Sequence, residues 1–168
     1  MSAFRNLMAF QRETEALAQI AGRLGWDQET MMPPGAAQQR GEEMSAIEGI
    51  LHARRTDPRV GDWLAGAQAA DAAGQRALDL IGRAYRRNAC IPARLAQETA
   101  RLTSVAQGIW ANARATDDVA AFLPTLAQIL DLRREAGQAL SAGGFGADAY
   151  DALIDEHEPG ATAATLKA

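Results

Sequence analysis

Apolar residues along the chain recur three and four positions apart, which is the spacing of one face of an α-helix. Between residues 3 and 24 the repeat is carried by Phe4, Leu7, Met8, Leu17, Ile20, Ala21 and Leu24. Gly25 follows this stretch and is expected to end the first helix. The segment from Trp26 to Gly35 is expected to be a loop, because Pro33 and Pro34 lack amide donors and restrict the residue before them.

The helical repeat continues beyond this loop. Further helices are expected over residues 36–55, from Asp57-Pro58 onward, over about 72–90 and from Pro92 to about 113. Aspartate caps a helix well and proline fits its first turn, so Asp57-Pro58 is a strong start signal. The helix over 72–90 is expected to turn its apolar side chains inward and its arginines, Arg83, Arg86 and Arg87, toward solvent.

The last fifty residues are also predicted to be helical. A helix capped by Thr116-Asp117-Asp118 is expected, with Pro124 either kinking or dividing it. A short acidic helix follows over 150–158, and Thr162 resembles the N-cap of one more. No strand-like alternation persists anywhere. The sequence therefore predicts an all-α antiparallel bundle of six to seven helices, with residues 1–168 as a single domain.

Composition narrows the classes of partner. Of the 168 residues 48% are hydrophobic and 5% aromatic, and the net charge of −4 provides no basic field for nucleic acid. No apolar stretch resembles a membrane span or a signal peptide, so neither a membrane nor export is expected. Cys90 is the single cysteine. Because it allows no internal disulfide, a reducing, cytoplasmic setting is expected.

The residues do not predict a metal site or a catalytic nucleophile. A helical zinc site needs two histidines one turn apart, but His52 and His157 are more than a hundred residues apart. The stretch His157-Glu158 begins like such a motif, yet Ala161 stands at the second ligand position and Pro159-Gly160 breaks the helix. His52 is interpreted as a surface or helix-terminal histidine, and no metal ligand is assigned in this chain.

Two groups of carboxylates are the remaining candidates for chemistry. Asp27 and Glu29 lie in the predicted loop beside Trp26. The second group lies near the carboxyl end and consists of Asp151, Asp155, Glu156 and Glu158. Neither has the spacing of a calcium loop. Both are interpreted as helix caps and solvated acidic surface rather than as acid-base pairs.

The stretch Leu24-Gly-Trp-Asp-Gln-Glu-Thr-Met-Met-Pro-Pro-Gly-Ala-Ala37 resembles the amino-terminal hallmark of the Taq-type metallocarboxypeptidases, Trp-Asp-x-Glu-Thr-x-Met-Pro-x-Gly-Gly-Ala. The resemblance continues through Arg40-Gly-Glu-Glu-Met and through Tyr150-Asp-Ala-Leu-Ile-Asp-Glu-His-Glu-Pro-Gly160, so it covers essentially the whole chain. Pro34 replaces the usual glycine of the hallmark, and His157 stands where tyrosine is common.

This resemblance implies a largely helical peptidase that releases carboxy-terminal amino acids from peptides. Family members are several times longer and hold zinc or cobalt with a His-Glu-x-x-His helix and a later Glu, all beyond residue 168. The chain is therefore expected to be a truncated amino-terminal segment, inactive alone, that forms one wall or lid of the substrate cleft. Trp26, Asp27 and Glu29 are the residues expected nearest that cleft, although the same loop could simply buttress the helices.

An alternative reading belongs to another class of function. Under this second hypothesis the chain is a free-standing helical interaction module that kept this part of the family and lost its catalysis. Homodimerisation through the face that carries Ile109 and Trp110 would then be expected, since an apolar face without its usual neighbour drives association. An in-frame His-Glu-x-x-His beyond codon 168 would favour the segment, and a stop codon the module.

Overall fold

The computed structural model describes residues 2–167, which form eight α-helices, one 3-10 turn and no β-strand. The elements are α1 (Ala3–Thr30), η1 (Pro34–Ala36), α2 (Ala37–Arg55), α3 (Pro58–Gly66), α4 (Ala72–Cys90), α5 (Ala93–Ala115), α6 (Val119–Ala142), α7 (Ala149–His157) and α8 (Ala163–Leu166). The predicted all-α class is confirmed. The helix number exceeds the predicted six to seven by the single-turn α8.

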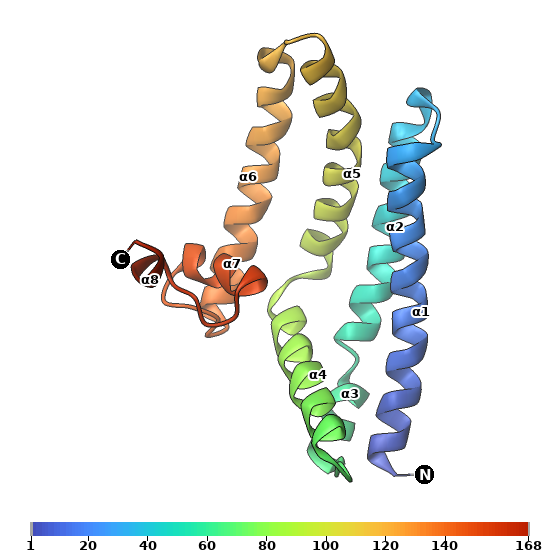
Figure 1. The fold of residues 1–168 in the computed structure, drawn as a ribbon, viewed down its shortest axis with the longest axis vertical. Helices are drawn as coiled ribbons and strands as arrows, with labels where there is room; N and C mark the ends of the chain where they lie inside the picture. The colour runs from blue at the N-terminus through green and yellow to red at the C-terminus, as the bar shows by residue number, and fades with distance from the viewer. Residues whose placement is uncertain (1, 168) are drawn as a thin grey trace.

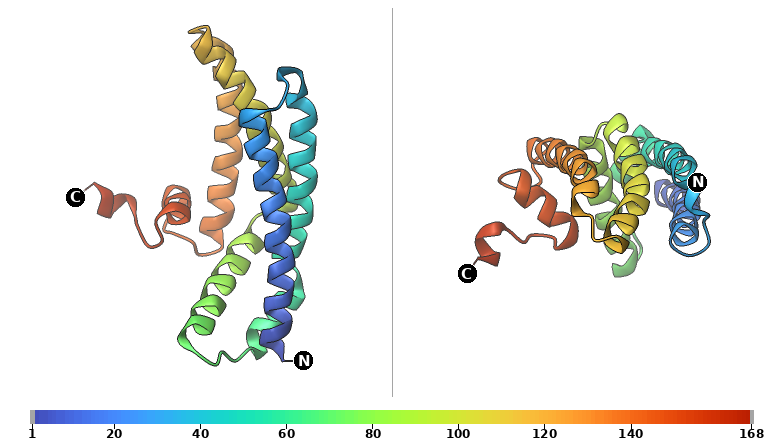
Figure 2. Two further views of the ribbon diagram at one scale, coloured as in Figure 1. Left: turned by 45° about the vertical axis from the view of Figure 1, so that its right-hand side comes forward. Right: turned by 90° about the horizontal axis from the view of Figure 1, so that it is seen from above.

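The long helices form an elongated row of neighbours (Figure 1). Helix α2 packs between α1 and α5, α5 pairs with α6, and α6 carries α7. The pairs α1–α2 and α5–α6 are antiparallel hairpins, while α3 and α4 close the end of the molecule nearest the amino terminus (Figures 1 and 2). Helices α7 and α8 lie to the side of this row, beyond α6, and carry the carboxyl end away from α1.

Helix α1 runs six residues further than the sequence predicts. Gly25 does not end it, and the residues from Trp26 to Thr30 are helical rather than a loop. A glycine inside a helix costs only about 1 kcal/mol relative to alanine, and Pro33 constrains the chain no earlier than residue 32. The helix therefore continues until the amides of Met31 and Met32 both donate to the Asp27 carbonyl oxygen, at 2.9 Å.

Close approach between α2 and α5 depends on a glycine. A Cβ atom at Gly41 would lie 2.7 Å from the Val105 side chain and 3.3 Å from the Arg101 carbonyl oxygen. The two helices bury Leu51 and Leu95 almost completely along their shared face. A larger residue at position 41 would push these helices apart, so this contact fixes the middle of the row.

The main apolar cluster lies where α1, α3 and the first half of α4 meet. Leu7 of α1, Val60 of α3 and Leu78 of α4 are buried together. Phe10 joins them and meets Trp63 edge to face, with ring centroids 5.5 Å apart. Helix α3 begins as predicted, with the Asp57 carboxylate accepting the Arg59 amide at 2.9 Å and Pro58 in the first turn.

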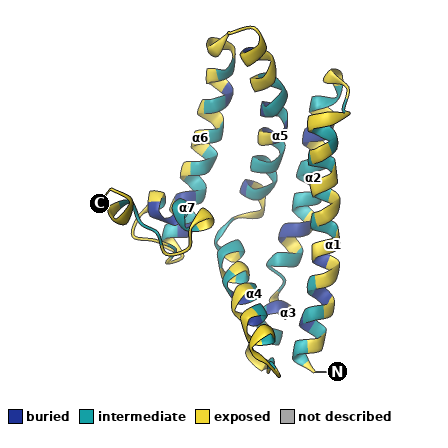
Figure 3. Cartoon of the chain, viewed as in Figure 1, coloured by how far each residue is buried: buried dark blue, intermediate teal, exposed yellow. Residues whose placement is uncertain are grey.

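The carboxy-terminal helices follow the predicted start signals. Asp118 caps α6 by accepting the Ala121 amide at 3.1 Å, and α6 then runs unbroken through Pro124, so this proline does not divide it. Thr162 caps α8 as predicted, in a reciprocal pair with Thr165. Exposed positions dominate the α5–α6 tip and α8 (Figure 3). In the part of the chain described here, no helix has the length and apolar character needed to cross a membrane.

Candidate functional site

The three residues predicted to lie nearest a substrate cleft occupy the last turns of α1. Trp26 is 64% exposed, and Glu29 also faces solvent. Asp27 instead binds Arg40 of α2, with Oδ2 and Nη2 2.6 Å apart. The structure therefore brings the three residues to one helix end, where Asp27 is paired with Arg40 while Trp26 and Glu29 are exposed.

Arg40 is the buried partner that holds this helix end. Its guanidinium group donates to Asp27, to Glu43 at 2.8 Å and to the Leu24 carbonyl oxygen. The hydrogen bond that Arg40 donates to the Asp27 carboxylate raises the pKa of Arg40 above its ordinary value, so this side chain stays charged. The Arg40 contacts tie the end of α1 to the start of α2 and make Asp27 a structural acid here.

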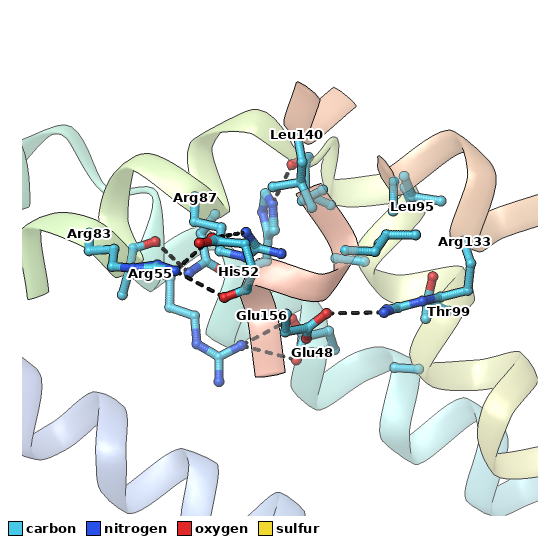
Figure 4. A pocket seen from close by; sticks show the side chains of 18 of the residues that line it. Glu48, His52, Arg55, Arg83, Arg87, Leu95, Thr99, Arg133, Leu140 and Glu156 are labelled. Carbon is cyan, nitrogen blue, oxygen red and sulfur yellow. Dashed lines mark hydrogen bonds and ion pairs between the residues drawn. The ribbon is translucent and has the colours of Figure 1, made fainter. Parts of the chain in front are cut away.

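A separate cavity of about 610 Å³ opens among α2, α4, α5, α6 and α7. Apolar side chains from all of these helices except α2 line it, namely Leu80, Ile91, Leu95, Leu140 and Leu153, with Ile91 just after α4. Charged side chains from α2, α4, α6 and α7 stand around them (Figure 4). We call this space the α4–α7 groove. None of the three predicted cleft residues lines it.

Asp155 is the centre of the ion pairs in the groove. It binds Arg83 at 2.6 Å and Arg87 at 3.0 Å, and its second oxygen accepts the Gly160 amide at 3.1 Å. Arg87 also donates to the Ala152 carbonyl oxygen at 2.9 Å. The prediction that Arg83 and Arg87 face solvent is wrong, because both guanidinium groups reach the Asp155 carboxylate of α7.

Two other acids of the predicted carboxy-terminal group, Asp151 and Glu156, are also engaged. Asp151 is buried and accepts the amide of Ala163, the first residue of α8, at 2.7 Å. Glu156 pairs with Arg133 of α6 at 3.0 Å. Interpreting this group as a solvated face is therefore wrong for Asp151 and Asp155. The four-residue spacing of Arg83 and Arg87 places both on one face of α4, and this is the signal that could have suggested a shared acidic partner.

His52 lies at the end of α2, as predicted, but it is buried rather than on the surface. Its Nε2 atom lies 2.7 Å from the Ile91 carbonyl oxygen, in the connection between α4 and α5. This contact gives a carbonyl at a helix junction its hydrogen-bond partner. The structural interpretation of His52 therefore accounts for its position in the groove wall.

The metal-ligating residue types of this chain do not converge. Across residues 2–167, no group of three or more His, Cys, Asp and Glu side chains is arranged to hold a metal ion. Helix α7 ends at His157, so the residues after it do not continue the turn that a paired-histidine site needs. What the described residues offer is an exposed end of α1 and an apolar groove with paired charges.

Comparison with known proteins gives a consistent result. A sequence model of the carboxypeptidase Taq (M32) metallopeptidase family matches residues 6–168. Thermostable carboxypeptidase 1 of Thermus thermophilus is 38% identical over 178 aligned positions, which cover 98% of this chain and 35% of the relative. The chain thus spans about a third of the length of the curated relatives it matches.

Solved structures share the fold. A crystal structure named BsuCP superposes with a TM-score of 0.90 over 98% of this chain and 33% of its own, and at 21% identity it speaks for the fold alone. The M32 carboxypeptidase from Deinococcus radiodurans is 28% identical and superposes with a TM-score of 0.72 over 98% of this chain and 33% of its own. On these matches the chain belongs to the carboxypeptidase Taq (M32) metallopeptidase family, of whose fold it is the amino-terminal portion.

Proposed function

We propose that this chain is the amino-terminal helical segment of a zinc- or cobalt-dependent carboxypeptidase that releases carboxy-terminal amino acids from peptides in the cytoplasm. The family match over residues 6–168 is the observation that carries this proposal. The segment alone does not hydrolyse peptides, because its histidines and carboxylates are used in structural contacts or stand apart. Zinc or cobalt would be held by residues of the remaining family fold.

The role of the segment in such an enzyme is to form one wall or lid of the substrate cleft. The end of α1 supports this role, because Arg40 fixes the helix end while Trp26 and Glu29 stay exposed. An aromatic and a carboxylate on a rigid helix end are suited to contact a peptide. Trp26, Asp27 and Glu29 remain the residues we place nearest the cleft, with Asp27 acting through Arg40.

A peptidase assay tests the proposal. The 168-residue chain is incubated with zinc or cobalt and an N-blocked dipeptide, and release of the carboxy-terminal amino acid is followed. The full-length Thermus thermophilus relative serves as the positive control. We expect no turnover and no metal retained after dialysis. Metal-dependent turnover by the chain itself would show that His52, His157 or the acidic residues act as ligands, and the proposal would then be wrong.

The alternative function is a free-standing module that dimerises through the face carrying Ile109 and Trp110. Its support is Trp110, whose large side chain is 47% exposed on α5. Light scattering of the wild type and of Trp110→Glu decides this point. A dimer that the substitution dissociates supports the module, whereas a monomer in both cases supports the segment. Sequencing the gene beyond codon 168 separates the two functions independently.

A further inference from the structure

The second half of α1 is held mainly by polar contacts. The buried residues of α1 are Leu7, Phe10 and Thr14, and none of its later positions, which the structure describes up to Thr30, is buried. At the rise of an α-helix, about 24 Å separate Thr14 from Thr30. This half reaches away from α3 and α4, where the apolar cluster lies (Figure 1). The hydrogen bonds that reach its far end therefore decide where Trp26 stands.

Gln28 connects this end of α1 to α5 through two hydrogen bonds. Its Nε2 atom donates to the Ser104 carbonyl oxygen at 2.7 Å, and the Ser104 hydroxyl donates to its Oε1 atom at 2.7 Å. Ser104 is buried, and its neighbour Val105 lies where the missing side chain of Gly41 lets α2 approach α5. Because both bonds are directional and must form together, they fit one distance and one rotation of the helix end.

Four consecutive residues divide between the inside and the outside of this helix end. Successive residues are rotated by about 100° around a helix axis, so Trp26 and Glu29 lie on one side and Asp27 and Gln28 on the opposite side. The two inner residues bind α2 and α5 respectively, whereas Trp26 and Glu29 are exposed. Rotating the helix end would break both inner contacts. These contacts therefore set the direction in which the two outer side chains point.

We propose that Gln28 and Ser104 are positioning residues of the substrate cleft, because their hydrogen bonds fix the rotation of the α1 end and thereby place Trp26 and Glu29 against the peptide. Gln28 itself contacts no substrate and acts through the two exposed side chains. This inference rests on the proposed function, since it requires that the α1 end meets a peptide. Gln28 is the better residue to change than Arg40, whose removal would leave the Asp27 carboxylate unpaired.

Amide exchange of the 168-residue chain tests the hydrogen bonds. Gln28→Glu keeps the shape of the side chain but replaces its amide donor with an oxygen. We expect residues 27–32 to exchange about tenfold faster, because a carboxylate oxygen then faces the Ser104 carbonyl oxygen, and residues 3–14 to exchange as in the wild type. Gln138→Glu makes the same change at an exposed position of α6 and should alter neither segment. Equal exchange of residues 27–32 in Gln28→Glu and the wild type would overturn the proposal.

Peptidase kinetics test the effect on substrate. In the chimera used, residues 1–168 replace the matching portion of the full-length Thermus thermophilus relative, and the substrate is an N-blocked pentapeptide. We expect Gln28→Glu to raise KM about fivefold with kcat unchanged, since a misplaced binding surface weakens binding without touching the reacting groups. Trp26→Ala should raise KM by a similar factor. Gln138→Glu should change neither constant.

The double variant shows whether Gln28 acts through Trp26. In Trp26→Ala the surface that Gln28 places is already reduced, so adding Gln28→Glu should raise KM much less than it does in the wild type. A residue that only stabilises the fold would instead have the same effect in both backgrounds. Ser104→Ala removes one of the two hydrogen bonds and adds no charge, so it should raise KM in the same direction by a smaller factor.

The outcomes separate this inference from the proposed function. An unchanged KM in Gln28→Glu, or equal effects of this change with and without Trp26, would overturn the inference and leave the proposed function standing. An unchanged KM in both Trp26→Ala and Glu29→Gln would mean that the α1 end does not meet the peptide. The cleft role in the proposed function and this inference would then both be wrong. A wild-type chimera without activity would count against both.

Discussion

The two halves of α4 face different kinds of neighbour. Its first half contributes Leu78 to the close-packed cluster with Leu7 and Val60. Its second half faces the α4–α7 groove, where Arg83 and Arg87 reach Asp155 of α7. One helix thus takes part in an apolar core at one end and in an ion-pair contact beside open space at the other.

The comparison distinguishes apolar burial, which stabilises the fold, from ion pairs, which orient one helix relative to another. Burying leucine and valine removes apolar surface from water and contributes about 25 cal/mol per Å² without requiring a particular partner. A guanidinium–carboxylate contact contributes less, since desolvation offsets much of its Coulomb energy, but it fixes the relative position of two helices. The cluster therefore holds α1, α3 and α4 together, while Asp155 sets where α7 lies.

The largest effect is expected in the apolar cluster. Leu7 is completely buried, so Leu7→Ala removes packed atoms and leaves a cavity that should lower the free energy of unfolding by about 3 kcal/mol. Urea unfolding followed by circular dichroism measures this change. Leu123→Ala, at an exposed position of α6, should stay within about 0.5 kcal/mol of the wild type. Similar losses at both sites would mean that Leu7 is not in a packed core.

A smaller effect is expected at the ion-pair centre. Asp155→Asn keeps the shape of the side chain but leaves Arg83 and Arg87 without their shared charge, which should cost about 1.5 kcal/mol because the three groups are only partly buried. Amide exchange should rise in α7 and remain unchanged in α1. Glu156→Gln is the control, and as its pair with Arg133 is more exposed it should cost less than about 0.5 kcal/mol.

If Asp155→Asn increased amide exchange in α1 as much as in α7, the claim that Asp155 positions α7 independently of the apolar cluster would be wrong. The same variant with added Arg83→Gln and Arg87→Gln sharpens the test. Removing the partners together should recover part of the loss, because no unpaired charge then remains.

The smallest effect is expected in the pH dependence of the α3 cap. Hydrogen bonds from the Arg59 side chain and amide hold the pKa of Asp57 below its ordinary 3.8. Because the folded pKa is the lower one, this stabilisation is present above pH 3.8 and disappears as the pH falls through the folded value. Asp57→Asn keeps a capping oxygen but loses the charge, and should cost about 0.5 kcal/mol at pH 7.

Unfolding free energies of the wild type and Asp57→Asn, compared from pH 7 down to pH 2.5, check this prediction. The difference between the two proteins should shrink at acid pH. A difference that grows as the pH falls would mean that the Asp57 carboxyl is stabilised in its protonated form, contrary to its contacts with Arg59.

The helices and their caps could be largely predicted from local signals. The Asp57-Pro58 start and the Thr162 cap act within four residues of themselves, so tertiary context does not alter them. The end of α1 could not be predicted in this way, because a single glycine such as Gly25 only weakly disfavours a helix. Whether the helix continues past it depends on whether a neighbouring helix supports the turns beyond. That support comes from Arg40, a residue of the next helix.

The candidate sites show the same limit. The pattern identified Trp26, Asp27 and Glu29 through a resemblance, and the structure adds that Asp27 is engaged by Arg40. The α4–α7 groove was not predicted at all. Its lining residues come from five helices that lie far apart in the sequence. No local pattern in the sequence indicates that these residues are neighbours in the folded protein.

The sequence by itself determined the all-α class, most helix starts and the family, because these depend on local periodicity, capping and a contiguous stretch of residues around Trp26. Only the tertiary structure decided which charges meet. Arg83 and Asp155 are 72 positions apart and form a pair because α6, which contacts both α4 and α7, brings Asp155 within reach of Arg83. Ion pairs and cavities of this kind depend on how helices are placed, and that placement follows from the packing of the whole chain.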